Sequence, residues 1–148
     1  MVRPGLPAHV TILYPFLLVT ELTGDIERAV GDIAAATPVT DVHLTELVTA
    51  PGFVAAAAPA LQPVADAVCA RWPDVRPYGG RFGPRPAARL TVAMSAKDAE
   101  IAQVSAEVRR WLPVHDRADA LHLVILTEHG WRRRLTAPFN AGVGMSSR

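Results

Sequence analysis

The chain has 148 residues, half of them hydrophobic, and a net charge of +1 at pH 7. That length suits a single domain with a real core, and the near-neutral charge excludes a protein that holds nucleic acid by bulk electrostatics alone. A single cysteine, Cys69, excludes an internal disulfide and a cysteine-based zinc site, and we expect it to be a small buried apolar residue.

The first half of the chain predicts two strands, a helix between them, and a second helix after a weaker strand. Residues 9–19 (HVTILYPFLLV) are rich in β-branched and aromatic residues and predict a strand. Residues 23–38 predict a helix with Ile26, Ala29, Val30 and Ile33 on its buried face. The alternation of residues 39–48 predicts a strand, residues 52–58 a weaker one, and residues 59–73 a helix that buries Leu61, Val64, Val68 and Trp72.

The second half begins with a loop and repeats the strand–helix pattern. Residues 73–86 (PDVRPYGGRFGPRP) are rich in Pro and Gly and predict a loop. A strand is predicted over 89–95, and a helix over 96–113 with Ile101, Val104, Val108 and Trp111 on one face. Residues 114–139 predict two or three strands, with a hairpin turn at 128–130.

Two near-copies of one short motif divide this pattern. HVTI begins at His9, and RLTV begins 80 residues later at Arg89. Strand–helix–strand blocks recur around both motifs. We therefore expect one α+β domain over residues 1–148, made of two similar interleaved lobes that each supply a strand to a shared cleft.

In a strand, the first and third residues of each motif would point to the same side and could act together on one ligand. Successive side chains point to opposite faces, so His9 and Thr11 share one face, as do Arg89 and Thr91. A neutral imidazole can take a proton and an imidazolium can give one, while threonine hydroxyls can hydrogen-bond phosphoryl oxygens. This set of groups suits phosphate ester chemistry without a metal or other cofactor.

The motifs and their surroundings resemble the two-histidine phosphoesterase superfamily, the 2′-5′ RNA ligase-like proteins. The resemblance includes LPAHVTILYPF at the start, PYGGRFG ahead of the LTVA strand, and the closing strands from Trp131 to Gly142. It implies a bilobal α+β fold with pseudo-twofold symmetry, antiparallel sheets facing a central cleft, and helices outside. It also implies metal-independent hydrolysis or formation of 2′,3′-cyclic or 2′-5′ phosphodiesters, with two histidines as base and acid and two threonines holding the phosphate.

The sequence departs from the family pattern at one position, because Arg89 stands where the second histidine is expected. An arginine stays protonated and cannot act as a general base, but it can bind phosphate bidentately. Three functions remain open on these grounds. The first is a phosphodiesterase-like hydrolase of a small cyclic or RNA-terminal phosphodiester, in which His9 transfers the proton and Arg89 fixes the phosphate. The others are a nucleotide- or phosphate-binding module without turnover, and a scaffold repurposed for a non-phosphoester reaction in specialised metabolism.

Other residues are candidates for ligand contact. Tyr14 and Phe16 are either core residues or a platform for a base, and Arg81 precedes the second motif closely enough to reach a ligand. The basic run at 132–134 predicts a solvated strand edge, or else a rim for a nucleotide phosphate. Among the remaining histidines, His43 is interpreted as an ordinary strand residue that could still face the cleft, His122 as a core residue and His129 as a solvated turn residue, while His115 has no assigned role.

Two expectations concern location and partners. The N-terminal stretch MVRPGLPAHVT has no apolar signal core, and no apolar run is long enough to span a membrane. We therefore expect a cytoplasmic protein with no membrane partner. Its partner is expected to be a small-molecule or RNA-end phosphodiester rather than an extended nucleic acid.

Overall fold

The computed structural model describes residues 9–94 and 97–142. Its three helices are α1 (Gly24–Ala35), α2 (Gln62–Arg71) and α3 (Asp98–Trp111). Short 3-10 turns lie at Val19–Glu21, Pro59–Leu61 and Pro77–Gly80. The strands are β1 (Thr40–Leu44), β2 (Leu47–Ala50), β3 (Phe53–Ala57), β4 (Arg89–Met94), β5 (Val114–Ala118), β6 (Ala120–Thr127) and β7 (Gly130–Pro138).

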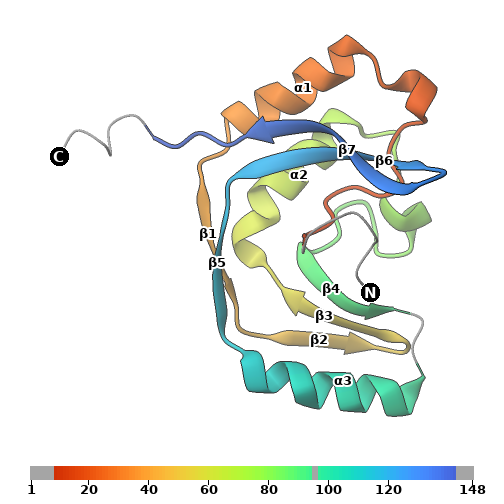
Figure 1. The fold of residues 1–148 in the computed structure, drawn as a ribbon, viewed down its shortest axis with the longest axis vertical. Coiled ribbons are helices and arrows are strands. Elements are labelled where there is room, and N and C mark those ends of the chain that lie inside the picture. Colours follow the sequence, from red (N-terminus) through yellow and green to blue (C-terminus); the bar gives the residue numbers. More distant parts are fainter. Residues whose placement is uncertain (1–8, 95–96, 143–148) are drawn as a thin grey trace.

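The strands form three small antiparallel sheets, so the predicted α+β class is confirmed. β1 pairs with β5, β2, β3 and β4 form a three-stranded sheet, and β6 and β7 form a hairpin. In Figure 1 the β1–β5 pair runs along one side of the molecule. It connects the hairpin and α1 at one end to the three-stranded sheet and α3 at the other.

The core lies where the helix periodicities predict it. Leu61, Val64, Val68 and Trp72 are all buried, and Val30 of α1 packs into the same cluster with Ile26, Ala29 and Ile33 around it. Strand β3 is Ala-rich and almost wholly buried. The predicted hairpin turn is also confirmed, because β6 ends at Thr127 and β7 begins at Gly130.

The predicted strand over residues 9–19 is wrong. Residues 9–18 have no regular structure, and a 3-10 turn follows them. Strand periodicity would send neighbouring side chains to opposite faces, yet the adjacent pairs Ile12–Leu13 and Phe16–Leu17 all pack against the core. One backbone hydrogen bond joins this segment to a loop that is distant in sequence, since the Tyr14 carbonyl accepts it from the Tyr78 amide. The apolar content thus predicted burial correctly and secondary structure incorrectly.

The predicted strand over residues 39–48 is two strands. β1 ends at Leu44 and β2 begins at Leu47, because the chain leaves its partner β5 there and joins β3. The Glu46 carbonyl, in the break, accepts a hydrogen bond from the Ala57 amide. The alternating pattern persists through both strands and therefore does not reveal the change of sheet.

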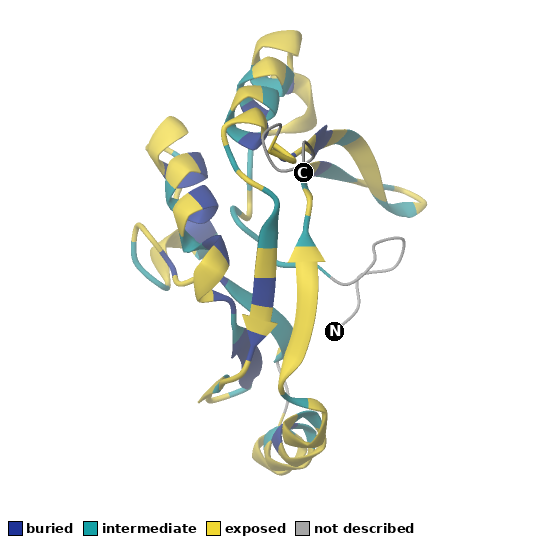
Figure 2. Cartoon of the chain, turned by 90° about the vertical axis from the view of Figure 1, so that its left-hand side faces the viewer, coloured by how far each residue is buried: buried dark blue, intermediate teal, exposed yellow. Residues whose placement is uncertain are grey.

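The predicted buried face of the third helix is correct except at its end. α3 packs on β2 and β3, with Ile101, Val104 and Val108 half-buried and Ser105 buried. Trp111 is 71% exposed, because it is the last residue of the helix. In Figure 2 most of α3 is coloured as exposed, at the lower end of the molecule.

Expectations at two places in the chain fall partly outside the described residues. The N-terminal stretch is described only from His9, and residues 95 and 96, between the second motif strand and α3, are not described. The C-terminal resemblance is described up to Gly142. Within the described part of the chain, no helix is long and apolar enough to cross a membrane.

Candidate active site

The second motif lies on β4, with Arg89 and Thr91 on one face. Arg89 is opposite Ala57 of β3 and Thr91 is opposite Ala55. Phe53 lies on the same face of β3, at i−2 and i−4 from these alanines. The small alanine side chains leave room for the long Arg89 side chain to lie across the sheet.

Arg89 is surrounded by aromatic rings. Its Cζ atom lies 4.1 Å from the ring centroid of Phe82, 4.7 Å from that of Phe53 and 5.8 Å from that of Tyr78. All three distances are within the range of a cation–π contact. Arg81 lies on the same Phe82 ring at 5.1 Å. The loop PYGGRFG therefore folds over the second motif and supplies two of the three rings.

The first motif segment, residues 9–18, reaches the same loop. The Tyr14 ring lies 6.5 Å from Tyr78 and 6.2 Å from Trp131 on β7. Tyr78 therefore contacts both Tyr14, three residues after Thr11, and Arg89 of the second motif. The two motif segments, 80 residues apart, converge on one aromatic residue.

The β6–β7 hairpin has one apolar face and one face of mixed polar and apolar residues. Leu123, opposite Leu135, and Ala137, opposite Leu121, belong to the face that packs into the core. The other face holds three cross-strand pairs: His122–Thr136, Val124–Arg133 and Leu126–Trp131. Because Trp131 contacts Tyr14, this second face is the one beside the first motif segment.

His122 is therefore not a core residue, and that prediction is wrong. Its strand is apolar in sequence, but the residues that alternate with His122 take the core face, which leaves its side chain exposed. Its Nδ1 atom is 3.1 Å from the Thr136 hydroxyl. Partial burial lowers the pKa of His122, and so do the charges of Arg133 and His9. The negative charge of Asp119 raises it. His9 is thus close enough to His122 for a positive charge on His9 to lower the pKa of His122.

The sequence of the chain matches a known family. The family model of the 2′-5′ RNA ligase superfamily matches residues 2–130, which is most of the chain. The chain belongs to this superfamily. The family places it among phosphoesterase- and ligase-type proteins that act on RNA phosphodiesters. A comparison with curated proteins found no match. The match ends at Gly130, so the resemblance of the closing strand is not covered by it.

The remaining predicted contact residues of this superfamily member have distinct positions. Phe16 packs edge-to-face on Trp72 at 4.9 Å, which favours the core role over the platform role. Tyr14 is 38% exposed and remains open to a ligand. Arg134, the extra residue of a bulge in β7, donates to Glu27 Oε1 at 2.9 Å and to the Leu22 carbonyl at 3.0 Å. Its side chain is therefore bound to α1, although all three residues of the basic run are exposed, as expected for a solvated edge.

The other histidines lie away from this arrangement of aromatic rings. His43 of β1 is exposed and pairs with His115 of β5, with their ring centroids 4.3 Å apart. The two line a surface pocket with Asp41, Asp116 and Arg117. His129 is exposed in the hairpin turn, as predicted, and lies 3.5 Å from the Glu128 carboxylate. No group of three or more His, Cys, Asp or Glu among the described residues could hold a metal ion.

Sequence reasoning missed five residues of this region: Phe53, Tyr78, Phe82, Trp131 and Thr136. Two of them were visible as the aromatic residues of the PYGGRFG loop, directly ahead of the second motif. Phe53 and Thr136 depend on strand register, which a bulge shifts in both sheets. No signal in the sequence reveals those shifts.

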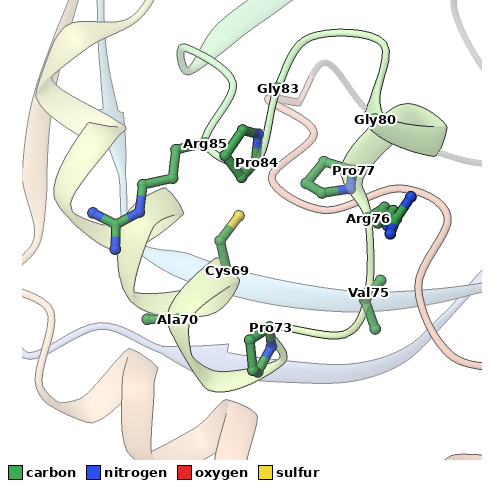
Figure 3. Close-up of a pocket in the computed structure, with 10 residues that line it drawn as sticks. All are labelled: Cys69, Ala70, Pro73, Val75, Arg76, Pro77, Gly80, Gly83, Pro84 and Arg85. Carbon is green, nitrogen blue, oxygen red and sulfur yellow. The ribbon is translucent and has the colours of Figure 1, made fainter.

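A separate pocket of about 450 Å³ lies behind the loop, between α2 and residues 73–85. Figure 3 shows the Cys69 thiol directed into it, with Pro77 and Pro84 beside it. None of the predicted site residues lines this pocket. Cys69 is buried, as predicted, and burial raises the pKa of its thiol, assisted by Asp66 and opposed by Arg85. The thiol is therefore protonated at neutral pH and a poor nucleophile.

Proposed function

We propose that this protein is a metal-independent phosphodiesterase that hydrolyses a small cyclic or RNA-terminal phosphodiester, of the 2′,3′-cyclic or 2′-5′ type. The observation that carries the proposal is the convergence of both motif segments on Tyr78, in a member of the 2′-5′ RNA ligase superfamily. In this proposal His9 transfers a proton at the phosphodiester, and the hydroxyls of Thr11 and Thr91 bind its free oxygens.

Arg89 takes the role of a fixed cation. Its guanidinium is held by three rings, so it loses little further conformational freedom when an anion binds. A prepositioned positive charge stabilises the negative charge that builds on a phosphoryl group in the transition state. Tyr14, partly exposed and next to Tyr78, offers an aromatic face on which a base can stack.

Arg89→Met is expected to weaken binding of the phosphodiester. Methionine retains an apolar contact with the rings but removes the charge, and a hydrogen bond to a charged group contributes about 1.5–3 kcal/mol. We therefore expect KM, or the Kd of inorganic phosphate, to rise roughly 10- to 100-fold. Arg89→Lys keeps the charge and should lose less. Equal Kd values for wild type and Arg89→Met would show that Arg89 serves only to pack the loop.

A binding module without turnover is the second candidate, and the environment of Arg89 favours it. An arginine held against three rings can bind an anion strongly but cannot transfer a proton. In that case phosphate or a nucleotide would raise the Tm of the protein by binding the native state. No product would form.

A panel of substrates tests the proposal. Purified protein is incubated, in the presence of a metal chelator, with 2′,3′-cyclic nucleotides, a 2′-5′-linked dinucleotide and its 3′-5′-linked isomer, and the products are separated by chromatography. The proposal predicts a phosphomonoester product from a cyclic or 2′-5′ substrate. Stabilisation by these ligands without any product supports the binding module, and neither product nor stabilisation contradicts both candidates.

A further inference from the structure

A second histidine–threonine pair lies beside the first motif. His122 and Thr136 are direct cross-strand neighbours on β6 and β7, and their side chains are joined by the 3.1 Å contact between Nδ1 and Oγ1. Each motif was expected to carry a His and a Thr, and the second keeps Thr91 but has Arg89 in place of the His. The hairpin supplies a histidine, with a threonine bonded to it, and a histidine is what the second motif lacks.

A ring contact and an electrostatic interaction place the first motif segment near this face of the hairpin. Tyr14 packs on Trp131, which is opposite Leu126. His9, five residues earlier, acts electrostatically on His122, which is four residues before Leu126 on β6. Tyr14 therefore lies against the hairpin at Trp131, and His9 lies near enough to His122 to affect its charge.

We propose that His122, oriented by Thr136, is the second proton-transfer residue of this site, in place of the imidazole missing at position 89. This inference rests on the proposed phosphodiesterase function. With Nδ1–H donating to the Thr136 hydroxyl, the lone pair of His122 lies on Nε2. That atom is directed away from Thr136, and the side chain is exposed to solvent.

The reaction then needs no group beyond these residues and water. Nε2 of His122 takes a proton from the attacking water as its oxygen forms a bond to phosphorus. The bond from phosphorus to one ribose oxygen breaks, and that oxygen receives a proton from protonated His9. The product is a phosphomonoester with a free hydroxyl, and the protons return through solvent. Arg89 remains charged throughout and stabilises the phosphoryl oxygens.

The charges around His122 suit the role of base. The groups that act on it are Arg133 from β7, Asp119 from the start of the hairpin and His9 from the first motif segment. Burial, Arg133 and His9 lower the pKa of His122 and outweigh Asp119, so its imidazole is neutral at pH 7. A neutral imidazole is the form that can accept the proton of water.

Kinetics against pH test the inference. Hydrolysis of a 2′,3′-cyclic nucleotide is measured for wild type, His122→Gln, Thr136→Val and the control His129→Gln, whose histidine is in the exposed turn. His122→Gln is expected to lower kcat by about 10²–10⁴-fold and to remove the acidic limb of the pH–rate profile. Thr136→Val should lower kcat less, and shift that limb, because it removes only the orienting hydroxyl. A profile unchanged by His122→Gln, in an enzyme that His9→Ala inactivates, overturns the role of His122 and leaves the proposed function standing.

An NMR titration gives a second readout that does not depend on turnover. The imidazole resonances of His122 are followed against pH in wild type and in His9→Ala. The inference predicts a pKa below that of an ordinary histidine in wild type, rising when the charge at His9 is removed. If the pKa of His122 is ordinary, or does not change in His9→Ala, the two histidines do not interact. That result contradicts the inference even if the protein shows no hydrolysis. If this coupling is present but no substrate is hydrolysed, the proposed function and the catalytic role built on it both fail.

Discussion

Replacing His9 by alanine is expected to lower the turnover of a 2′,3′-cyclic nucleotide by about 10²–10⁴-fold, the usual effect of losing a general acid or base. His9 belongs to the intact HVTI motif, and Arg89 cannot take over its proton transfer because a guanidinium stays protonated. The effect should fall on kcat, since the phosphate contacts that we propose for Arg89 and the threonines are left in place. Initial rates at saturating substrate measure it.

The matched control is His129→Ala, which removes an exposed histidine from the hairpin turn. It should leave kcat and KM unchanged, and both variants should keep the Tm of the wild type. A His9→Ala variant that is as active as His129→Ala would remove His9 from the mechanism.

Trp72→Ala is expected to give the largest loss of stability, about 3–5 kcal/mol in the free energy of unfolding. Trp72 is buried at the end of α2, where its ring packs edge-to-face on Phe16 at 4.9 Å. The residue thus fixes the first motif segment, which has no strand partner of its own, to the helical core. Urea denaturation followed by circular dichroism measures the change.

Trp72→Phe is the control for this prediction. The indole nitrogen of Trp72 is buried without a hydrogen-bond partner among the described residues, so phenylalanine forfeits no hydrogen bond and keeps most of the ring contact. We expect a much smaller loss than for alanine. A comparable loss in both variants would mean that a single ring does not fill the site and that the full volume of the indole is what stabilises this junction.

The helices could be predicted from sequence because their burial follows a single periodicity. Val30 and the four apolar residues of the second helix face one core, so their spacing alone identifies them. The first motif segment could not, because its burial is irregular and its backbone bonds to a distant loop at Tyr78. A local pattern carries no information on such a contact.

The candidate site was predictable in its motifs and unpredictable in its surroundings. His9, Thr11, Arg89 and Thr91 follow from two short repeats, and their roles remain predictions. The rings around Arg89 come from strand β3, through its register with β4, and from the fold of the loop directly ahead of β4. His122 was misassigned because an apolar strand does not reveal which of its faces meets the core, and only the pairing with Thr136 shows it.

The most direct test is the rate of 2′,3′-cyclic nucleotide hydrolysis by the wild-type protein beside Arg89→His, in the presence of a metal chelator. If an arginine suffices at this position, the wild type forms a phosphomonoester, and Arg89→His is no more than modestly faster. If the wild type is inactive and Arg89→His is active, the native protein has given up this chemistry, and the proposal that it is a working phosphodiesterase is wrong.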